Sequence, residues 1–143
     1  MANIILDTNV ISELMRQKPD ETVLDWFAHR QADVFYITAI VQSEIALGIS
    51  LLPPGKRRDA LAAAAEGMFS DEFVDRCLPF DAECADLYAS VVSASRQSGI
   101  SMTTEDAQIA AIALSVGYPL ATRNVKDFQH ISGLSIHDPW RRS

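Results

Sequence analysis

The chain has 143 residues, of which 48% are hydrophobic and 22% charged, a composition typical of one globular domain. Its 12 basic and 19 acidic residues give a net charge of −7, which argues against the basic stripe of a high-affinity nucleic-acid binder. This acidity fits simple solubility or attraction to a basic protein partner. No segment approaches the ~20 consecutive apolar residues of a membrane span, and no basic signal-peptide region opens the chain. We therefore expect a cytoplasmic protein without a membrane partner.

Short strands and helices are predicted to alternate along the chain. Short apolar or β-branched runs indicate buried strands, and longer stretches with helical spacing of apolar residues indicate helices. In chain order the predicted elements are a strand at 3–7, a helix near 10–15, a helix opened by Pro19 and Asp20, a strand at 34–37, a helix capped by Thr38 that runs to Leu52, a helix at 56–69, a strand at 74–80, a helix capped by Asp81 that runs to about Gln97, a helix capped by Thr103 or Thr104 that runs to Val116, a strand at 119–122, a helical turn at 124–128 and a strand at 134–136. This alternation predicts a mainly parallel sheet with helices on both faces, an α/β/α fold in a single domain over 1–143.

Three acidic residues interrupt apolar stretches that otherwise resemble buried core. Asp7 ends the first strand, Glu44 lies within the helix that follows Thr38, and Asp106 lies in the first turn of a later helix. A carboxylate near a core is costly unless it is paired or binds a metal. Functional groups of parallel α/β sheets collect at the carboxyl ends of the strands, so we expect these acids to converge on one cleft. Such a group of oxygen ligands suits Mg²⁺ or Mn²⁺ and metal-assisted attack of water on a phosphodiester.

The helix that follows Thr38 has an apolar pattern that we expect to face the core. Glu44 neighbours several of these apolar residues, which places its carboxyl beside the core. The predicted core-facing residues are Ile40, Val41, Ile45, Leu47 and Leu51.

Each acid also has an ordinary structural interpretation. Asp7 is a suitable cap for the helix after it, although Asn9 would serve equally well. Glu44 is a good helix former and would be unremarkable on an exposed face. Asp106 and Glu105 are both typical first-turn acids, but only Asp106 shares the core-facing stripe, so we expect Glu105 to face solvent.

Other residues with chemical potential carry weaker signals. Arg123 suits either a phosphate contact or a surface salt bridge. Trp26 and Trp140 are expected in the core or at an interface. Cys77 and Cys84 lack zinc-site spacing and are expected to be reduced and semi-buried. The three histidines show no ligand spacing, which favours structural or surface roles.

Four segments in order resemble the motifs of PIN-domain nucleases: LDTNVISEL, SEIALGI, TEDAQIAAIAL and LATRNVKDF. The resemblance covers nearly the whole chain and is closest to the VapC/FitB branch, the toxin halves of bacterial toxin–antitoxin pairs. It implies a PIN fold and a Mg²⁺- or Mn²⁺-dependent endoribonuclease. By that resemblance, Asp7, Glu44 and Asp106 match the family's metal-binding acids, and Thr8 and Asn9 match polar residues beside the first acid.

The fourth motif departs from the commonest family pattern. Asn124 falls where many relatives have a fourth acid, and we treat it as a candidate catalytic residue at that position. Asp127 either supplies the missing charge or stabilises a short helix. The resemblance further implies an RNA substrate, a homodimer, and a small antitoxin that wraps the toxin and blocks the acidic cleft, in some cases within larger assemblies. A degenerate non-catalytic PIN module and another metal-dependent phosphoryl hydrolase remain alternatives.

Overall fold

The computed structural model describes residues 1–142 and is built on one parallel sheet. Its five strands lie in the order β3-β2-β1-β4-β5. They are β1 (Asn3–Leu6), β2 (Val34–Thr38), β3 (Cys77–Leu78), β4 (Leu120–Ala121) and β5 (Ile136–His137). Every neighbouring pair is parallel, with β1 in the centre between β2 and β4. The carboxyl ends of all five strands therefore meet at one edge, as predicted.

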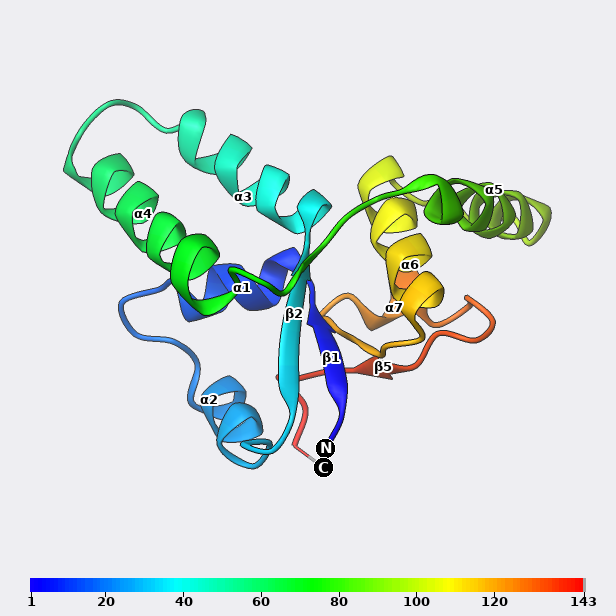
Figure 1. Ribbon diagram of the computed structural model, residues 1–143, viewed down its shortest axis with the longest axis horizontal. Coiled ribbons are helices and arrows are strands. Elements are labelled where there is room, and N and C mark those ends of the chain that lie inside the picture. The colour runs from blue at the N-terminus through cyan, green and yellow to red at the C-terminus, as the bar shows by residue number, and fades with distance from the viewer. Residues whose placement is uncertain (143) are drawn as a thin grey trace.

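Helices flank the sheet in an α/β/α arrangement, which confirms the predicted fold class. Figure 1 shows α1 to α4 on one side of the central strands and α5 to α7 on the other. Their bounds are α1 (Thr8–Leu14), α2 (Glu21–Ala28), α3 (Ala39–Ser50), α4 (Lys56–Gly67), α5 (Ala82–Gln97), α6 (Thr104–Val116) and α7 (Val125–Phe128). Within residues 1–142, no helix has both the length and the apolar character needed to cross a bilayer.

Helix boundaries follow the capping residues of the sequence. The Thr38 hydroxyl accepts the backbone N–H of Val41, and the Asp81 carboxylate accepts that of Cys84. Thr103 rather than Thr104 caps α6, because its hydroxyl accepts the backbone N–H of Asp106 at 3.1 Å. These bonds satisfy N–H groups that have no partner within their own helix.

The predicted strand at 74–80 is wrong in extent. Only Cys77 and Leu78 pair with β2, and the π-helical turn η1 (Met68–Glu72) carries the chain from α4 toward this strand. The Arg76 guanidinium donates to the carbonyl of Phe35, so a side chain makes contact with β2 just before the strand begins. Pro79 follows at once and has no N–H to extend the ladder.

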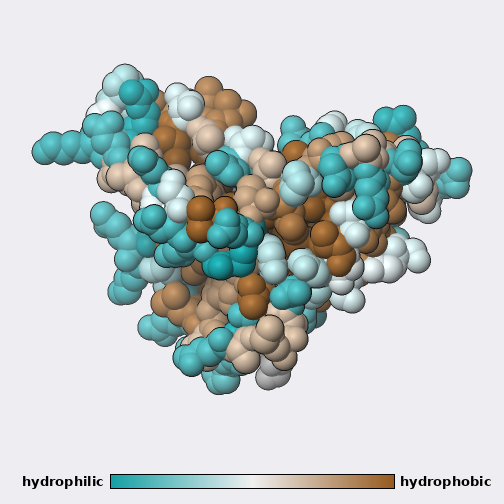
Figure 2. Space-filling view, in the orientation of Figure 1, coloured by the Kyte–Doolittle hydropathy of each residue, from teal (hydrophilic) through white to brown (hydrophobic). Residues whose placement is uncertain are grey.

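The predicted core face of α3 is correct only for its first half. Val41 and Ile45 are buried, whereas Leu47 and Leu51 are 59% and 75% exposed. Figure 1 shows the reason, since α3 extends with α4 beyond the sheet as a helical hairpin. Figure 2 shows brown, hydrophobic side chains at the surface along this hairpin, next to teal, hydrophilic ones.

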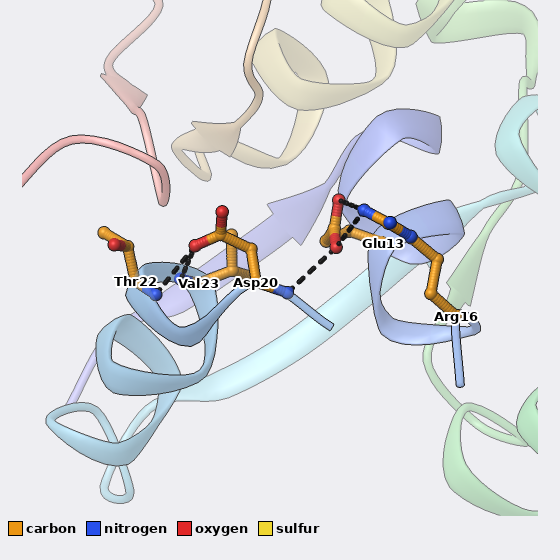
Figure 3. Close-up of polar contacts among 5 residues, drawn as sticks. All are labelled: Glu13, Arg16, Asp20, Thr22 and Val23. Atoms are coloured by element: carbon orange, nitrogen blue, oxygen red, sulfur yellow. Dashed lines mark hydrogen bonds and ion pairs between the residues drawn. The ribbon is translucent and has the colours of Figure 1, made fainter. Parts of the chain in front are cut away.

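A buried acid that sequence analysis did not single out joins α1 to α2. Glu13 is 6% exposed, and its carboxylate accepts the backbone N–H of Asp20 at 2.9 Å and the guanidinium of Arg16 at 3.1 Å (Figure 3). The Asp20 carboxylate then caps α2 through the backbone N–H groups of Thr22 and Val23. Glu13 therefore fixes the entry of the chain into α2, a structural role.

Candidate active site

Asp7 lies where β1 ends and α1 begins, and it is 3% exposed. One carboxylate oxygen accepts the backbone N–H of Thr8 at 2.8 Å, and the other accepts the Thr122 hydroxyl at 2.8 Å. The Asn9 amide makes a longer contact of 3.5 Å with the second oxygen. The capping interpretation is therefore correct, but the cap uses one oxygen only.

Burial raises the pKa of the Asp7 carboxyl. The hydrogen bonds from Thr122 and Thr8 lower this pKa, and the negative charge of Asp127 raises it further.

Thr122 is a member of this network that sequence analysis did not identify. Its side chain is fully buried beyond the end of β4, and its hydroxyl accepts the Asn9 amide at 3.3 Å and the backbone N–H of Asn124 at 3.1 Å. The register of β1 with β4 places it next to Asp7, whose own N–H donates to the carbonyl of Ala121. The available signal was a hydroxyl residue directly after the apolar pair of β4, but its partner depends on which strands pair.

Glu44 reaches the same edge of the sheet from α3. Its carboxylate accepts the Thr8 hydroxyl at 2.8 Å, so Thr8 links Asp7, through its backbone, to Glu44, through its side chain. Glu44 is only partly buried, so its exposure lies between the two predicted alternatives, a position beside the core and an exposed helix face. Burial raises its pKa, the Thr8 hydroxyl lowers it, and the negative charges of Asp7 and Glu105 raise it. Glu105 itself is exposed, as predicted.

Asp106 completes a group of three acids from the first turn of α6. Its pKa is raised to about 6, first by burial and then by the negative charge of Asp7. The hydrogen bond with Thr103 lowers this pKa, whereas Asp127 and Glu44 raise it. Asp7, Glu44 and Asp106 thus lie near enough to repel one another, and the sheet brings the three predicted acids together.

The charge of these three acids has no basic partner on the described chain. The ion pairs found within residues 1–142 join Arg16 to Glu13, Arg30 to Asp33 and Arg142 to Asp25. In the same residues no three acidic, histidine or cysteine side chains already stand close enough to ligate one ion together. The group therefore has the oxygen donors and the excess negative charge that suit a hard cation, but the partly exposed side chains would have to turn inward to enclose one.

The remaining predicted site residues surround the three acids. Asn124 holds the network through its backbone N–H, and its exposed side chain makes no capping bond to α7. The backbone N–H of Arg123 donates to the Asn9 side-chain carbonyl at 3.1 Å, while its guanidinium lies over the ring of Trp140. Asp127 is exposed and acts on the group through its charge.

The raised pKa of Asp106 predicts how the stability of the metal-free protein depends on pH. The folded protein keeps a proton on this carboxyl up to about pH 6, whereas the unfolded chain releases it near 3.8. The free energy of unfolding should therefore fall as pH rises through this interval. We expect Asp106→Asn to raise the free energy of unfolding at about pH 7 by ~1 kcal/mol, after allowance for solvent screening of a half-exposed group, and by much less at about pH 4.

Chemical denaturation at both pH values measures this difference. Asp86→Asn, which removes an exposed acid from α5, is the matched control and should change stability little at either pH. An equal gain for Asp106→Asn at both pH values would contradict the prediction.

Comparison with known proteins identifies the family. The sequence pattern of the PIN domain matches residues 4–134. The chain belongs to the PIN-domain family. The PIN-domain chain is 42% identical to the plasmid stability protein StbB of Pseudomonas syringae pv. tomato over 96% of its length and 98% of the relative's. It is 37% identical to VapC ribonuclease Y4jK of Sinorhizobium fredii (96% and 97% covered) and 35% identical to toxin FitB of Neisseria gonorrhoeae (96% and 98% covered).

A solved structure supports the same relationship. The PIN domain described here matches a chain of the structure of FitAB bound to the IR36 DNA fragment with a TM-score of 0.87 and 34% identity, covering 98% of this chain and 97% of that chain. The VapC/FitB resemblance drawn from the four sequence motifs is thereby confirmed.

Proposed function

We propose that this PIN-domain protein is a Mg²⁺- or Mn²⁺-dependent endoribonuclease and the toxin component of a bacterial toxin–antitoxin pair. The observation that carries the proposal is the buried Asp7 carboxylate facing Glu44 and Asp106 with no basic partner among the described residues. The similarity to a VapC ribonuclease and to toxin FitB supports the same activity.

The chain's own residues suit a divalent ion at this site. Asp7, Glu44 and Asp106 would hold it, since carboxylate oxygens are the preferred ligands of Mg²⁺ and Mn²⁺. When bound, such an ion supplies an activated water for attack on phosphorus and stabilises the leaving oxygen. Thr122 and Thr8 fix the orientation of Asp7, and the Thr8 hydroxyl orients Glu44. These outer bonds hold Asp7 in place before the ion arrives, whereas Glu44 and Asp106, which are only partly buried, would turn toward the ion when it binds.

The proposal extends to partners. RNA is the substrate, and the protein works as a homodimer silenced by a cognate antitoxin. The similarity to a protein named VapC ribonuclease supports the RNA substrate, and the similarity to toxin FitB and to a chain of the FitAB structure supports the partner protein. The excess of negative charge suits a basic inhibitory segment. Light scattering of the protein alone and with a copurified antitoxin measures both assemblies.

The decisive test is RNA cleavage with and without metal. Purified protein is incubated with total cellular RNA in Mn²⁺ or in EDTA, and the new ends are mapped by sequencing. Defined cuts that require Mn²⁺ support the proposal. Binding of RNA without cleavage would instead favour the non-catalytic module, an alternative for which the neutral Asn124 is the specific observation.

The neutral side chain at position 124 predicts an uneven pair of metal sites. We expect one ion bound by the three acids and a weaker second ion that arrives with the RNA phosphate. Asn124→Asp should strengthen binding of the second ion about tenfold, because it adds a carboxylate while keeping the backbone N–H bond to Thr122. Calorimetric titration with Mn²⁺ measures the two affinities.

Gln129→Glu provides the control for this substitution. It adds the same charge at the exposed end of α7 and should leave both affinities nearly unchanged. Two fully occupied ions in the free wild-type protein would show that position 124 does not limit the second site.

A further inference from the structure

Arg123 begins next to the acidic site through its backbone, and its guanidinium has no acidic partner among residues 1–142. Arg123 is exposed, it takes part in none of the ion pairs of residues 1–142, and its side-chain N–H groups make no hydrogen bond there. Its central carbon lies 5.0 Å from the centre of the Trp140 ring. A guanidinium held over an aromatic ring keeps its N–H donors at its edge, where they remain available to a ligand.

Both partners of this contact are fixed by the scaffold. The backbone N–H of Arg123 donates to Asn9, whose amide contacts Asp7, so the start of the side chain is tied to the candidate active site. Trp140 packs against the hydrophobic core, and its backbone N–H donates to the Asp138 carboxylate at 3.0 Å. It follows β5, the strand paired with β4, which places both residues beyond the ends of neighbouring strands.

The position of the guanidinium has a chemical consequence. The backbone of Arg123 is tied to Asn9 beside Asp7, while its guanidinium lies over Trp140. No basic group is among the influences on the pKa of Asp7 or Asp106, so this cation does not neutralise the acids. A cation placed among the carboxylates would compete with a metal ion. A cation held at the rim is instead available for a negatively charged substrate, and its planar N–H fork matches a phosphate.

We propose that Trp140 is a positioning residue, which holds the Arg123 guanidinium at the rim of the site to bind an RNA phosphate next to the one that is cleaved. This proposal rests on the proposed function. The contact with RNA is made by Arg123, and Trp140 acts through it. Loss of the ring should therefore weaken substrate binding more than it slows the chemical step.

The test is a double-mutant cycle on cleavage of a single-stranded RNA in Mn²⁺. We expect Arg123→Gln to raise KM about tenfold and Trp140→Leu to raise it about fivefold, with a much smaller change in kcat. Trp140→Phe, which keeps an aromatic face, should restore most of the affinity. In the Arg123→Gln protein, Trp140→Leu should have no further effect on KM.

A second Arg–Trp pair in the same chain provides the control. Arg30 lies over Trp26 at 4.6 Å, so Arg30→Gln removes an equivalent stacked charge and should leave KM unchanged. The salt dependence of RNA binding, measured by fluorescence anisotropy in Ca²⁺, should decrease by about 0.7 in slope for Arg123→Gln and not for Arg30→Gln.

Three outcomes would overturn the inference. A full effect of Trp140→Leu in the Arg123→Gln protein would mean that the ring contacts RNA directly or only supports the fold. An unchanged KM of the Arg123→Gln protein, together with weaker binding of the antitoxin, would mean that Arg123 binds a carboxylate of the antitoxin and not RNA. Normal RNA affinity of Trp140→Leu in Ca²⁺ would remove the positioning role. Failure of the wild-type protein to cleave RNA would instead refute the proposed function, and the anisotropy measurement would still decide the role of Trp140.

Discussion

Asp7→Asn should lower the rate of RNA cleavage about a thousandfold while the protein stays folded. The carboxylate is buried and held by Thr8 and Thr122, so the substitution removes a preformed anionic ligand without changing its shape. Because burial raises the pKa of Asp7, a neutral amide is also tolerated well there by the fold. Cleavage assays, Mn²⁺ titration calorimetry and thermal unfolding measure the three consequences.

The matched control is again Asp86→Asn, which removes one negative charge from an exposed position on α5 and should cleave RNA at the wild-type rate. An Asp7→Asn protein with unchanged Mn²⁺ affinity would place the ion elsewhere. If its activity fell only together with its unfolding temperature, the loss would reflect folding and not chemistry.

The largest expected effect on stability is at Glu13. Glu13→Ala should lower the free energy of unfolding by about 2–3 kcal/mol, because it removes a buried acceptor and leaves the Asp20 N–H without its partner. Glu13→Gln keeps a carbonyl acceptor for this N–H and should lose about half as much. Chemical denaturation of the purified variants measures both values.

Glu66→Ala is a suitable comparison, since Glu66 is an exposed acid of α4, and we expect a change within about 0.5 kcal/mol. Arg16→Gln should also have a small effect, because the Arg16 side chain is 65% exposed. A loss as large in Arg16→Gln as in Glu13→Ala would mean that the ion pair, and not the bond to Asp20, holds α2 in place.

Much of the fold was predictable because local chemistry and long-range packing agree. Short apolar runs separated by helices predict a parallel sheet, and Thr38 and Asp81 mark helix starts by their capping bonds. The three acids were predictable because each interrupts an apolar run. An acid in an apolar run is not always a site residue, as Glu13 shows. Its buried carboxylate accepts the backbone N–H of Asp20 and the guanidinium of Arg16, and it has a structural role.

The features that could not be predicted depend on tertiary contacts. Thr122 becomes a site residue only because β1 pairs with β4, more than a hundred residues later in the chain. Leu47 and Leu51 have the spacing of core residues, but α3 is longer than the sheet that it covers. The edge strand β3 is only two residues long, because it pairs with only the last part of β2.

The position of β1 has a consequence for the cell that makes this protein. Asp7 leaves the ribosome well before its hydroxyl partner Thr122 and the flanking strand β4, which lie more than a hundred residues later in the chain. Chains are synthesised from the N-terminus at roughly 5–20 residues per second, so Asp7 waits on the order of ten seconds for the strand that orients it. The surroundings of Asp7 are thus completed only after β4 has been made, which delays assembly of the candidate site during translation.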